Sequence, residues 1–164
     1  MDALPKQAEL VVQAARAHGL ELDLHEFPAG TPTAADAANA VGCDVEQIVK
    51  SLLFMADDRP VLVLTSGRNR VDIDKVGKQL GAGEVRKADA NQARAATGYA
   101  IGGTPPFGHP SPLDVLIDQD LTGFDQVWAA AGTPRHVFPI SPPDLVRASG
   151  GKVCDVAEVL AGTG

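Results

Sequence analysis

The chain has 164 residues, of which 45% are apolar and only 4% aromatic, so we expect a single domain over residues 1–164 with an aliphatic core. Its formal net charge of −7 argues against a broad nucleic-acid footprint, because neutralising many phosphates needs clustered Lys and Arg. That charge leaves room for a protein that grips only the end of an RNA, whereas DNA is not an expected partner.

The sequence also lacks the patterns of membrane, metal and cofactor proteins. No apolar run approaches the roughly 20 residues of a membrane span, and the first residues do not resemble a secretory signal. Cys43 and Cys154 lie far apart, without the spacing of a zinc site. Neither a phosphate-binding P-loop nor a dinucleotide fingerprint is present. We therefore expect a cytoplasmic protein with reduced thiols, no membrane contact, no metal and no cofactor.

Periodicity and turn residues divide the first half of the chain into short elements. Thr33, with Asp36 three residues later, has the pattern of a capping box, and Gly42 ends the helix that it starts. The expected elements are a helix over 5–18, a strand over 21–27 closed by Pro28-Ala29-Gly30, a helix from 33, a helical turn over 45–49, a hairpin of strands 51–56 and 60–65, a helix over 72–80 and a strand over 84–87.

The second half continues the mixture of helices and strands. Asp89 caps one expected helix, and Ser141 followed by two prolines starts another. The expected elements are a helix over 89–97, a loop over 98–109, strands over 113–118, 126–131 and 136–140, a helix over 141–149 and an edge strand over 153–156. Because helices and strands do not alternate strictly, the pattern predicts an α+β fold with a largely antiparallel or mixed sheet.

The loop over residues 98–109 has an unusual composition, with four glycines and two adjacent prolines. Glycine allows positive φ and a close approach of backbone to a ligand, while proline fixes φ and removes N–H donors. A stiff loop with bare amides suits an oxyanion or a phosphate. The same composition also makes an ordinary tight turn, and composition alone leaves both interpretations open.

Two side chains outside this loop are candidates for chemistry. Lys50 follows a helical turn and precedes an apolar strand, a position where the helix dipole alone would favour a cation. His136 opens a strand and could carry a proton near neutral pH, although a structural histidine is the commoner outcome. There is no Gly-x-Ser-x-Gly elbow and no activated cysteine. A hydrolytic site here would therefore rely on water, positioning and backbone donors, which suits an activated ester.

Several ordered motifs go beyond composition. They are His25-Glu26-Phe27, Thr-Ala-Ala-Asp-Ala-Ala over 33–38, Gln-Ile-Val-Lys-Ser-Leu-Leu over 47–53, Arg70-Val71-Asp72, Gly-Tyr-Ala-Ile-Gly-Gly-Thr-Pro-Pro-Phe-Gly over 98–108, and Ala-Gly-Thr-Pro-Arg-His over 131–136. Together they resemble the YbaK/EbsC family, the free-standing relatives of the editing domain inserted in bacterial prolyl-tRNA synthetases. The resemblance extends over about the whole chain, to Val156.

The resemblance implies a fold and an activity. The implied fold is a compact α/β domain whose central mixed, barrel-like sheet is surrounded by helices. The implied activity is hydrolysis of the ester that joins a wrong, small amino acid (Ala, Cys, Ser or Thr) to a tRNA(Pro)-type acceptor end, with a synthetase as a second partner. Two alternatives stay open: a non-catalytic module that binds a nucleotide or RNA end, and a hydrolase of another small acyl ester.

The resemblance also implies roles for individual residues. The family's pocket lysine corresponds to Lys50, which would anchor the terminal nucleotide. Amides near Gly102 and Gly103 would face the ester carbonyl oxygen. The remaining implied residues contact the substrate: Thr104 and Pro105, where relatives often have Val-Ser, together with Pro106, His136, Ser51 and Phe27.

Overall fold

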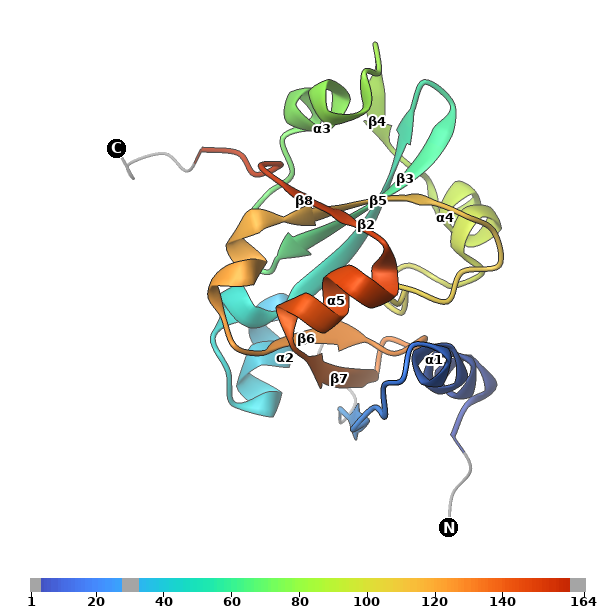
Figure 1. The fold of residues 1–164 in the computed structure, drawn as a ribbon, viewed down its shortest axis with the longest axis vertical. Helices are drawn as coiled ribbons and strands as arrows, with labels where there is room; N and C mark the ends of the chain where they lie inside the picture. The colour runs from blue at the N-terminus through green and yellow to red at the C-terminus, as the bar shows by residue number, and fades with distance from the viewer. Residues whose placement is uncertain (1–3, 28–32, 160–164) are drawn as a thin grey trace.

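The computed structural model describes residues 4–27 and 33–159 and confirms the expected mixture of helices and strands (Figure 1). The helices are α1 (Lys6–Ala17), α2 (Ala34–Val41), α3 (Ile73–Leu80), α4 (Ala90–Thr97) and α5 (Pro142–Ser149), with the 3-10 turns η1 (Val45–Gln47) and η2 (Gln119–Gly123). The strands are β1 (His25–Glu26), β2 (Val49–Ala56), β3 (Arg59–Ser66), β4 (Val85–Lys87), β5 (Asp114–Asp118), β6 (Val127–Ala130), β7 (His136–Ile140) and β8 (Lys152–Cys154).

The strands form two sheets. The larger sheet has the order β4-β2-β3-β5-β8, in which β4, β2 and β3 are antiparallel neighbours while β5 and β8 join in parallel, so the expected mixed sheet is confirmed. The smaller sheet, β1-β7-β6, is antiparallel. A bridge between Ile48 and Trp128 links the two sheets in the described part of the chain. Closure into a barrel is therefore not confirmed.

Local signals set the element boundaries. The capping box of Thr33 and Asp36 forms at the start of α2, and Asp89 caps α4 in the same way. Helix α2 ends at Gly42, whose φ of 77° is the left-handed value that glycine adopts without strain. The β2–β3 hairpin turns at Asp57 and Asp58, which both have positive φ, as a two-residue type I′ turn requires.

Two of the expected strands are shorter or placed differently in the structure. The strand expected over 21–27 is only His25–Glu26, because Leu22 and Leu24 pack against the core without strand partners among the described residues. The end assigned to Pro28-Ala29-Gly30 lies outside the described residues. The last strand is β8, since the carbonyl of Val156 instead accepts a hydrogen bond from the Asp72 amide at 2.8 Å. The turn η2 was not expected at all.

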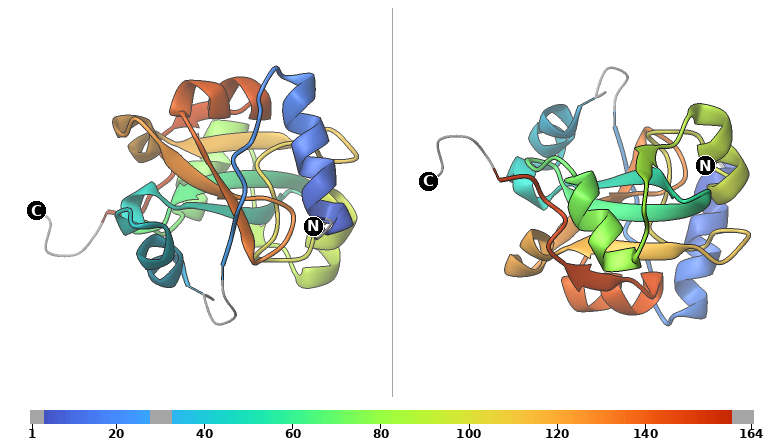
Figure 2. Two further views of the ribbon diagram at one scale, coloured as in Figure 1. Left: turned by 90° about the horizontal axis from the view of Figure 1, so that it is seen from below. Right: turned by 90° about the horizontal axis from the view of Figure 1, so that it is seen from above.

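The hydrophobic core fills both sides of the larger sheet. One cluster lies between the two sheets and includes Val49, Leu62 and Phe138, while a second lies under α3 and includes Val63. Figure 2 shows α1, α2 and α5 placed around the sheets on different sides. In the described part of the chain, no helix combines the length and apolar character needed to cross a membrane.

Candidate substrate pocket

A cavity of about 300 Å³ opens where the two sheets meet, between α2, the first half of β2 and the glycine-proline loop. Residues from five segments line it: Phe27; Thr33, Ala34 and Ala37; Ile48, Val49, Lys50, Ser51 and Leu52; Ile101, Gly102 and Thr104; and Trp128, Ala130, Pro134 and Val137. Most of these side chains are apolar. Among the lining residues that the structure describes, Lys50 is the only charged one.

The cavity exists because β2 is only partly paired. Strand β2 pairs with β3 along its whole length, but it pairs with β4 only from Phe54 to Ala56. Its first half therefore has no strand paired on that side. Strand β6 approaches there through the bridge between Trp128 and Ile48, the residue before β2. At this edge the hydroxyl of Ser51 is buried and has no hydrogen-bond partner among the described residues. A buried hydroxyl without a partner is costly, which makes Ser51 a candidate for binding a ligand.

The sequence suggested that Lys50 precedes a strand, but the structure places it inside β2. Its half-buried side chain lines the cavity, and its ammonium donates a hydrogen bond to the carbonyl of Asn69 at 2.6 Å. Burial lowers the pKa of Lys50, and the positive charge of Arg70 lowers it further, while the carboxylate of Asp118 opposes both effects. Lys50 is thus a cation held in place at the cavity wall.

The two glycines of the loop have different roles in the structure. Gly102 lines the cavity with φ of 91°, and its amide donates no hydrogen bond within the described residues. The amide of Gly103, by contrast, donates to the carbonyl of Ala100 at 3.0 Å. A Cβ at Gly103 would lie 2.9 Å from the Gly132 carbonyl oxygen, so this position needs glycine because two loops touch there. Of the two expected amides, that of Gly102 alone has no hydrogen-bond acceptor within the part of the chain that the structure describes.

The prolines support the loop from behind. Thr104 reaches the cavity, although its hydroxyl donates to the Ala100 carbonyl at 3.3 Å. Pro105 and Pro106 are buried and do not line the cavity. The Pro105 carbonyl accepts a hydrogen bond from Nε2 of His109 at 2.8 Å; burial lowers the pKa of His109, and this bond partly offsets the effect. The loop is thereby fixed by hydrogen bonds from its own side chains to its backbone carbonyls.

His136 is buried but does not line the cavity. Its Nδ1 lies 2.6 Å from the hydroxyl of Thr133, and its Nε2 lies 3.9 Å from a carboxylate oxygen of Glu26. The adjacent Arg135 holds Phe27, which does line the cavity: the Phe27 amide donates to the Arg135 carbonyl at 2.7 Å, and Nε of Arg135 donates to the Phe27 carbonyl at 3.1 Å. This turn therefore acts on the wall rather than inside the cavity.

Apart from Phe27, the apolar wall of the cavity was not expected from the sequence. Trp128, whose ring packs edge-on against His25 with centroids 4.9 Å apart, closes one side. Ile48 and Ala37 close another side. These residues carry no local motif, because they come from separate elements that meet only in the fold. Among the described residues, no cluster of three or more His, Cys, Asp or Glu is placed to hold a metal ion.

The chemistry that the cavity offers is binding and orientation. It combines one cation, one free amide, one buried hydroxyl and an apolar wall. None of the described lining residues is a His, Cys, Asp or Glu, so no lining side chain is a ready general base. Such a site can place an acyl group, hold an anionic neighbour and stabilise a developing oxyanion.

Known proteins are similar to this chain in fold and in sequence. A crystal structure of a proposed trans-editing enzyme for prolyl-tRNA synthetase is 43% identical, with a TM-score of 0.90 over 96% of this chain and 100% of that one. The uncharacterized protein YwhH of Bacillus subtilis is 31% identical over 134 residues, which are 81% of this chain and 85% of YwhH.

Longer proteins contain a related segment. The proline–tRNA ligase of Ligilactobacillus salivarius is 36% identical over 107 residues, covering 60% of this chain. This match spans only 19% of the ligase, so the chain corresponds to about a fifth of that protein. Residues 28–148 match the family model of the aminoacyl-tRNA editing domain. The chain belongs to the aminoacyl-tRNA editing domain family.

Proposed function

We propose that this protein is a trans-acting hydrolase that removes a wrong, small amino acid from a tRNA(Pro)-type aminoacyl-tRNA. The observation that carries the proposal is the cavity itself, where Lys50 and Gly102, whose amide has no acceptor among the described residues, line one apolar pocket in a chain of the editing family. The similar structure described as a proposed trans-editing enzyme for prolyl-tRNA synthetase supports the choice of tRNA.

The size of the cavity supports a small acyl group. The volume of about 300 Å³ lies at the lower end of the range for small-ligand pockets. A pocket of this size suits the acyl group of one small amino acid. The acyl group therefore lies inside against Ile48 and Trp128, and the terminal adenosine lies at the mouth.

The proposed reaction uses binding rather than a catalytic side-chain base. Lys50 holds the terminal phosphate or ribose and so places the ester, while the amide of Gly102 donates to its carbonyl oxygen as negative charge develops. Water adds to the carbonyl carbon, the bond to the ribose oxygen breaks, and the water proton passes to that oxygen with help from the neighbouring ribose hydroxyl. The products are the free amino acid and deacylated tRNA.

The other expected residues receive more limited roles. Ser51 offers its unpartnered hydroxyl to the amino group of the substrate, and Phe27 and Thr104 bound the pocket. Gly103 keeps the two loops in contact. Residues behind the wall shape the site without touching the substrate; these are Pro105, Pro106 and His136.

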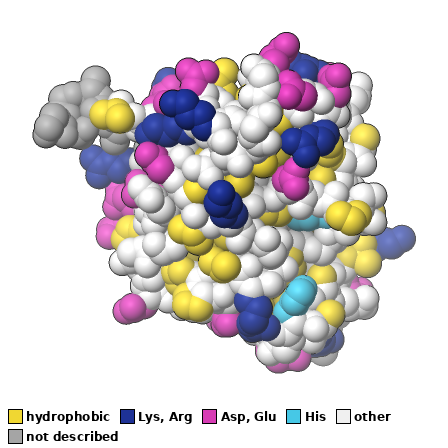
Figure 3. Space-filling model, turned by 45° about the horizontal axis from the view of Figure 1, so that its top comes forward, with side chains coloured by type: hydrophobic (Ala, Val, Ile, Leu, Met, Phe, Trp, Pro, Cys, Tyr) yellow, Lys and Arg dark blue, Asp and Glu magenta, His cyan; other side chains and the backbone are white. Residues whose placement is uncertain are grey.

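The acidic surface limits how the tRNA is held. On the face in Figure 3, Lys and Arg side chains are scattered among acidic and apolar ones instead of forming one patch. With a net charge of −7, contact is confined to the acceptor end, which a synthetase can deliver as a second partner. A pocket that filters by size discriminates by only about 1–3 kcal/mol per methylene, so imperfect selectivity is expected.

A deacylation panel tests the proposal. Purified protein is mixed with tRNA(Pro) charged with Ala, Cys, Ser or Thr, and with correctly charged Pro-tRNA(Pro) as a control, and release of labelled amino acid is followed. Turnover of at least one mischarged species, with the proline ester spared, is expected. Binding of the acceptor end without any turnover would instead support the binding module, and activity on free aminoacyl esters alone would indicate a different ester hydrolase.

A further inference from the structure

The ammonium of Lys50 is held by a chain of hydrogen bonds that runs through Asn69 to Asp118, outside the cavity. We call this chain of hydrogen bonds the tether. Nζ of Lys50 donates to the backbone carbonyl of Asn69 at 2.6 Å. Asn69 is itself buried. Its backbone N–H donates a hydrogen bond to the carbonyl of Ser66 at 2.9 Å, which fixes the turn after β3. The position of the Lys50 charge therefore depends on how firmly Asn69 is held.

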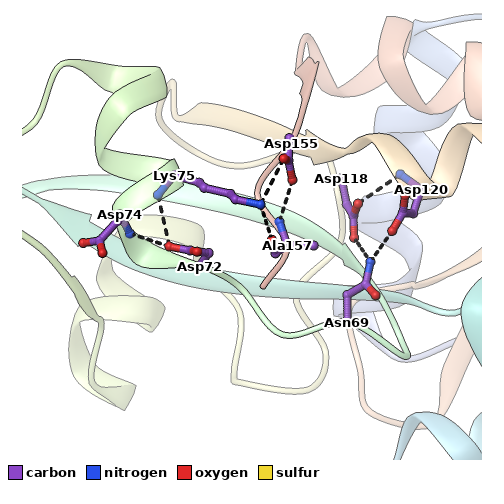
Figure 4. A network of polar contacts seen from close by, with 8 residues as sticks. All are labelled: Asn69, Asp72, Asp74, Lys75, Asp118, Asp120, Asp155 and Ala157. Carbon is purple, nitrogen blue, oxygen red and sulfur yellow. Dashed lines mark hydrogen bonds and ion pairs between the residues drawn. The ribbon is translucent and has the colours of Figure 1, made fainter. Parts of the chain in front are cut away.

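The side chain of Asn69 is held by two carboxylates (Figure 4). Nδ2 of Asn69 donates to Oδ2 of Asp118 at 2.8 Å and to Oδ2 of Asp120 at 2.7 Å. Both amide hydrogens are thereby used. Because Asp118 ends β5 and Asp120 lies in η2 directly after it, the turn that carries the Asn69 carbonyl is fastened to the strand that neighbours β3 on the side away from β2.

Asp118 is the fixed end of this chain of contacts. Its side chain is completely buried, Oδ2 also accepts from the Ser66 amide at 3.1 Å, and Oδ1 accepts from the Asp120 amide at 3.0 Å. A buried carboxylate is retained only where hydrogen bonds and charge compensate its lost hydration.

The charges around Lys50 make Asp118 its favourable neighbour. Arg70 and Lys87 both disfavour the protonated ammonium, whereas Asp118 favours it. Asp120 faces the same turn through Asn69. The buried carboxylate thus supplies negative charge behind a lysine whose other charged neighbours are positive.

We propose that Asn69 and Asp118 are positioning residues that hold the ammonium of Lys50, charged and in one orientation, at the wall of the cavity. The inference rests on the proposed function for the use of Lys50 but not for the tether itself. A lysine side chain is flexible, and one that is already ordered loses less rotamer freedom when it meets the substrate. Neither residue touches the substrate in this scheme.

A purely structural brace would behave differently. It would lower stability when broken, yet it would leave the ionisation of Lys50 unchanged and would weaken the protein equally with or without Lys50. Two measurements separate these cases. A thermal melt does not, because breaking the contacts lowers stability in both. The matched control is Asp155→Asn, which removes a carboxylate that accepts from Lys75 at 3.0 Å in the same view but lies outside the cavity lining.

The first measurement needs no tRNA. The ε-methylene signal of Lys50 is titrated by NMR in isotopically labelled wild type, Asp118→Asn and Asp155→Asn. The pKa of Lys50 is expected to fall in Asp118→Asn, because the favourable charge is gone, and to match wild type in Asp155→Asn. An unchanged Lys50 pKa in a folded Asp118→Asn protein would overturn the proposal, whatever the protein does to tRNA.

The second measurement is a double-mutant cycle on single-turnover deacylation. Asn69→Ala removes both side-chain hydrogen bonds but keeps the backbone carbonyl, so it also serves if Asp118→Asn does not fold. Asp118→Asn and Asn69→Ala are each expected to slow deacylation by about 10- to 100-fold, the scale of a misplaced catalytic contact. In a Lys50→Ala background the same changes are expected to add little. Equal further losses in that background would contradict a role through Lys50.

Discussion

Replacing Gly103 with alanine tests whether the contact between two loops sets the shape of the pocket. The new Cβ would lie 2.9 Å from the carbonyl oxygen of Gly132, 2.9 Å from Cα of Thr133 and 3.0 Å from its carbonyl carbon. All three are backbone atoms, so no side chain can rotate away, and the loops must separate by several tenths of an ångström. Gly102 and Pro134, which lie on these two loops, both line the cavity, so the change must reach its wall.

The loss of stability that Gly103→Ala causes can be bounded. Forcing extra volume into a packed contact costs about 1–3 kcal/mol. Because 1 kcal/mol shifts the melting midpoint by about 2–4 °C in a chain of this length, a fall of roughly 2–12 °C is expected. Displacement of the wall is expected to lower kcat/KM for deacylation by about 10- to 100-fold. Thermal melts by circular dichroism and single-turnover kinetics measure the two effects.

Gly123→Ala is the matched control, because a Cβ there meets nothing within 4 Å and the residue does not have positive φ. It should change stability by less than about 0.5 kcal/mol and leave the rate unaltered. If Gly103→Ala melts within about 1 °C of this control and deacylates at the same rate, the shape of the pocket does not depend on the contact between the loops.

Further predictions concern pH, pocket size and the hairpin turn. Burial lowers the pKa of Lys50 below 10.5, so as pH rises activity should fall before an ordinary lysine would deprotonate; Lys50→Arg should remove this alkaline fall in a pH–rate profile. In the window between the folded-state and unfolded-state pKa the unfolded chain binds more protons, so urea melts should show the Lys50 contribution to stability rising with pH. Ala130→Val narrows the cavity and should disfavour the larger of two acyl groups by about 1–3 kcal/mol in a competition assay. Asp58→Gly relieves a positive φ of 70°, and the exposed 3.7 Å ion pair with Arg86 that it removes contributes little, so a thermal melt should show a higher melting midpoint.

Elements with local signals were predictable from the sequence. Thr33 and Asp89 cap their helices through short-range hydrogen bonds, and the short apolar runs on either side of Asp57 and Asp58 form the hairpin. The strand over 21–27 was overestimated because alternation reports which side chains are buried, whereas a strand also needs a partner. Only His25 and Glu26 find one, on β7.

The pocket could be predicted only in part. Lys50, Gly102, Thr104, Phe27 and Ser51 were expected at the site and do line the cavity. The apolar wall could not be predicted, because residues such as Trp128 reach the site through the meeting of two sheets.

Other expected positions lie behind the surface of the cavity. Gly103 and His136 were expected at the site, and the structure places them behind its wall. The tether from Asp118 was equally hidden in the sequence, since it depends on the parallel pairing of β3 with β5.

The most direct test of the proposed role of Lys50 in deacylation compares wild type with Lys50→Ala on one mischarged tRNA(Pro) under single-turnover conditions. Lys78→Ala is the control, because Lys78 is an exposed lysine on α3 that does not line the cavity. Lys50→Ala is expected to deacylate at least about 100-fold more slowly, while Lys78→Ala is expected to match wild type. Equal rates for wild type and Lys50→Ala would contradict it.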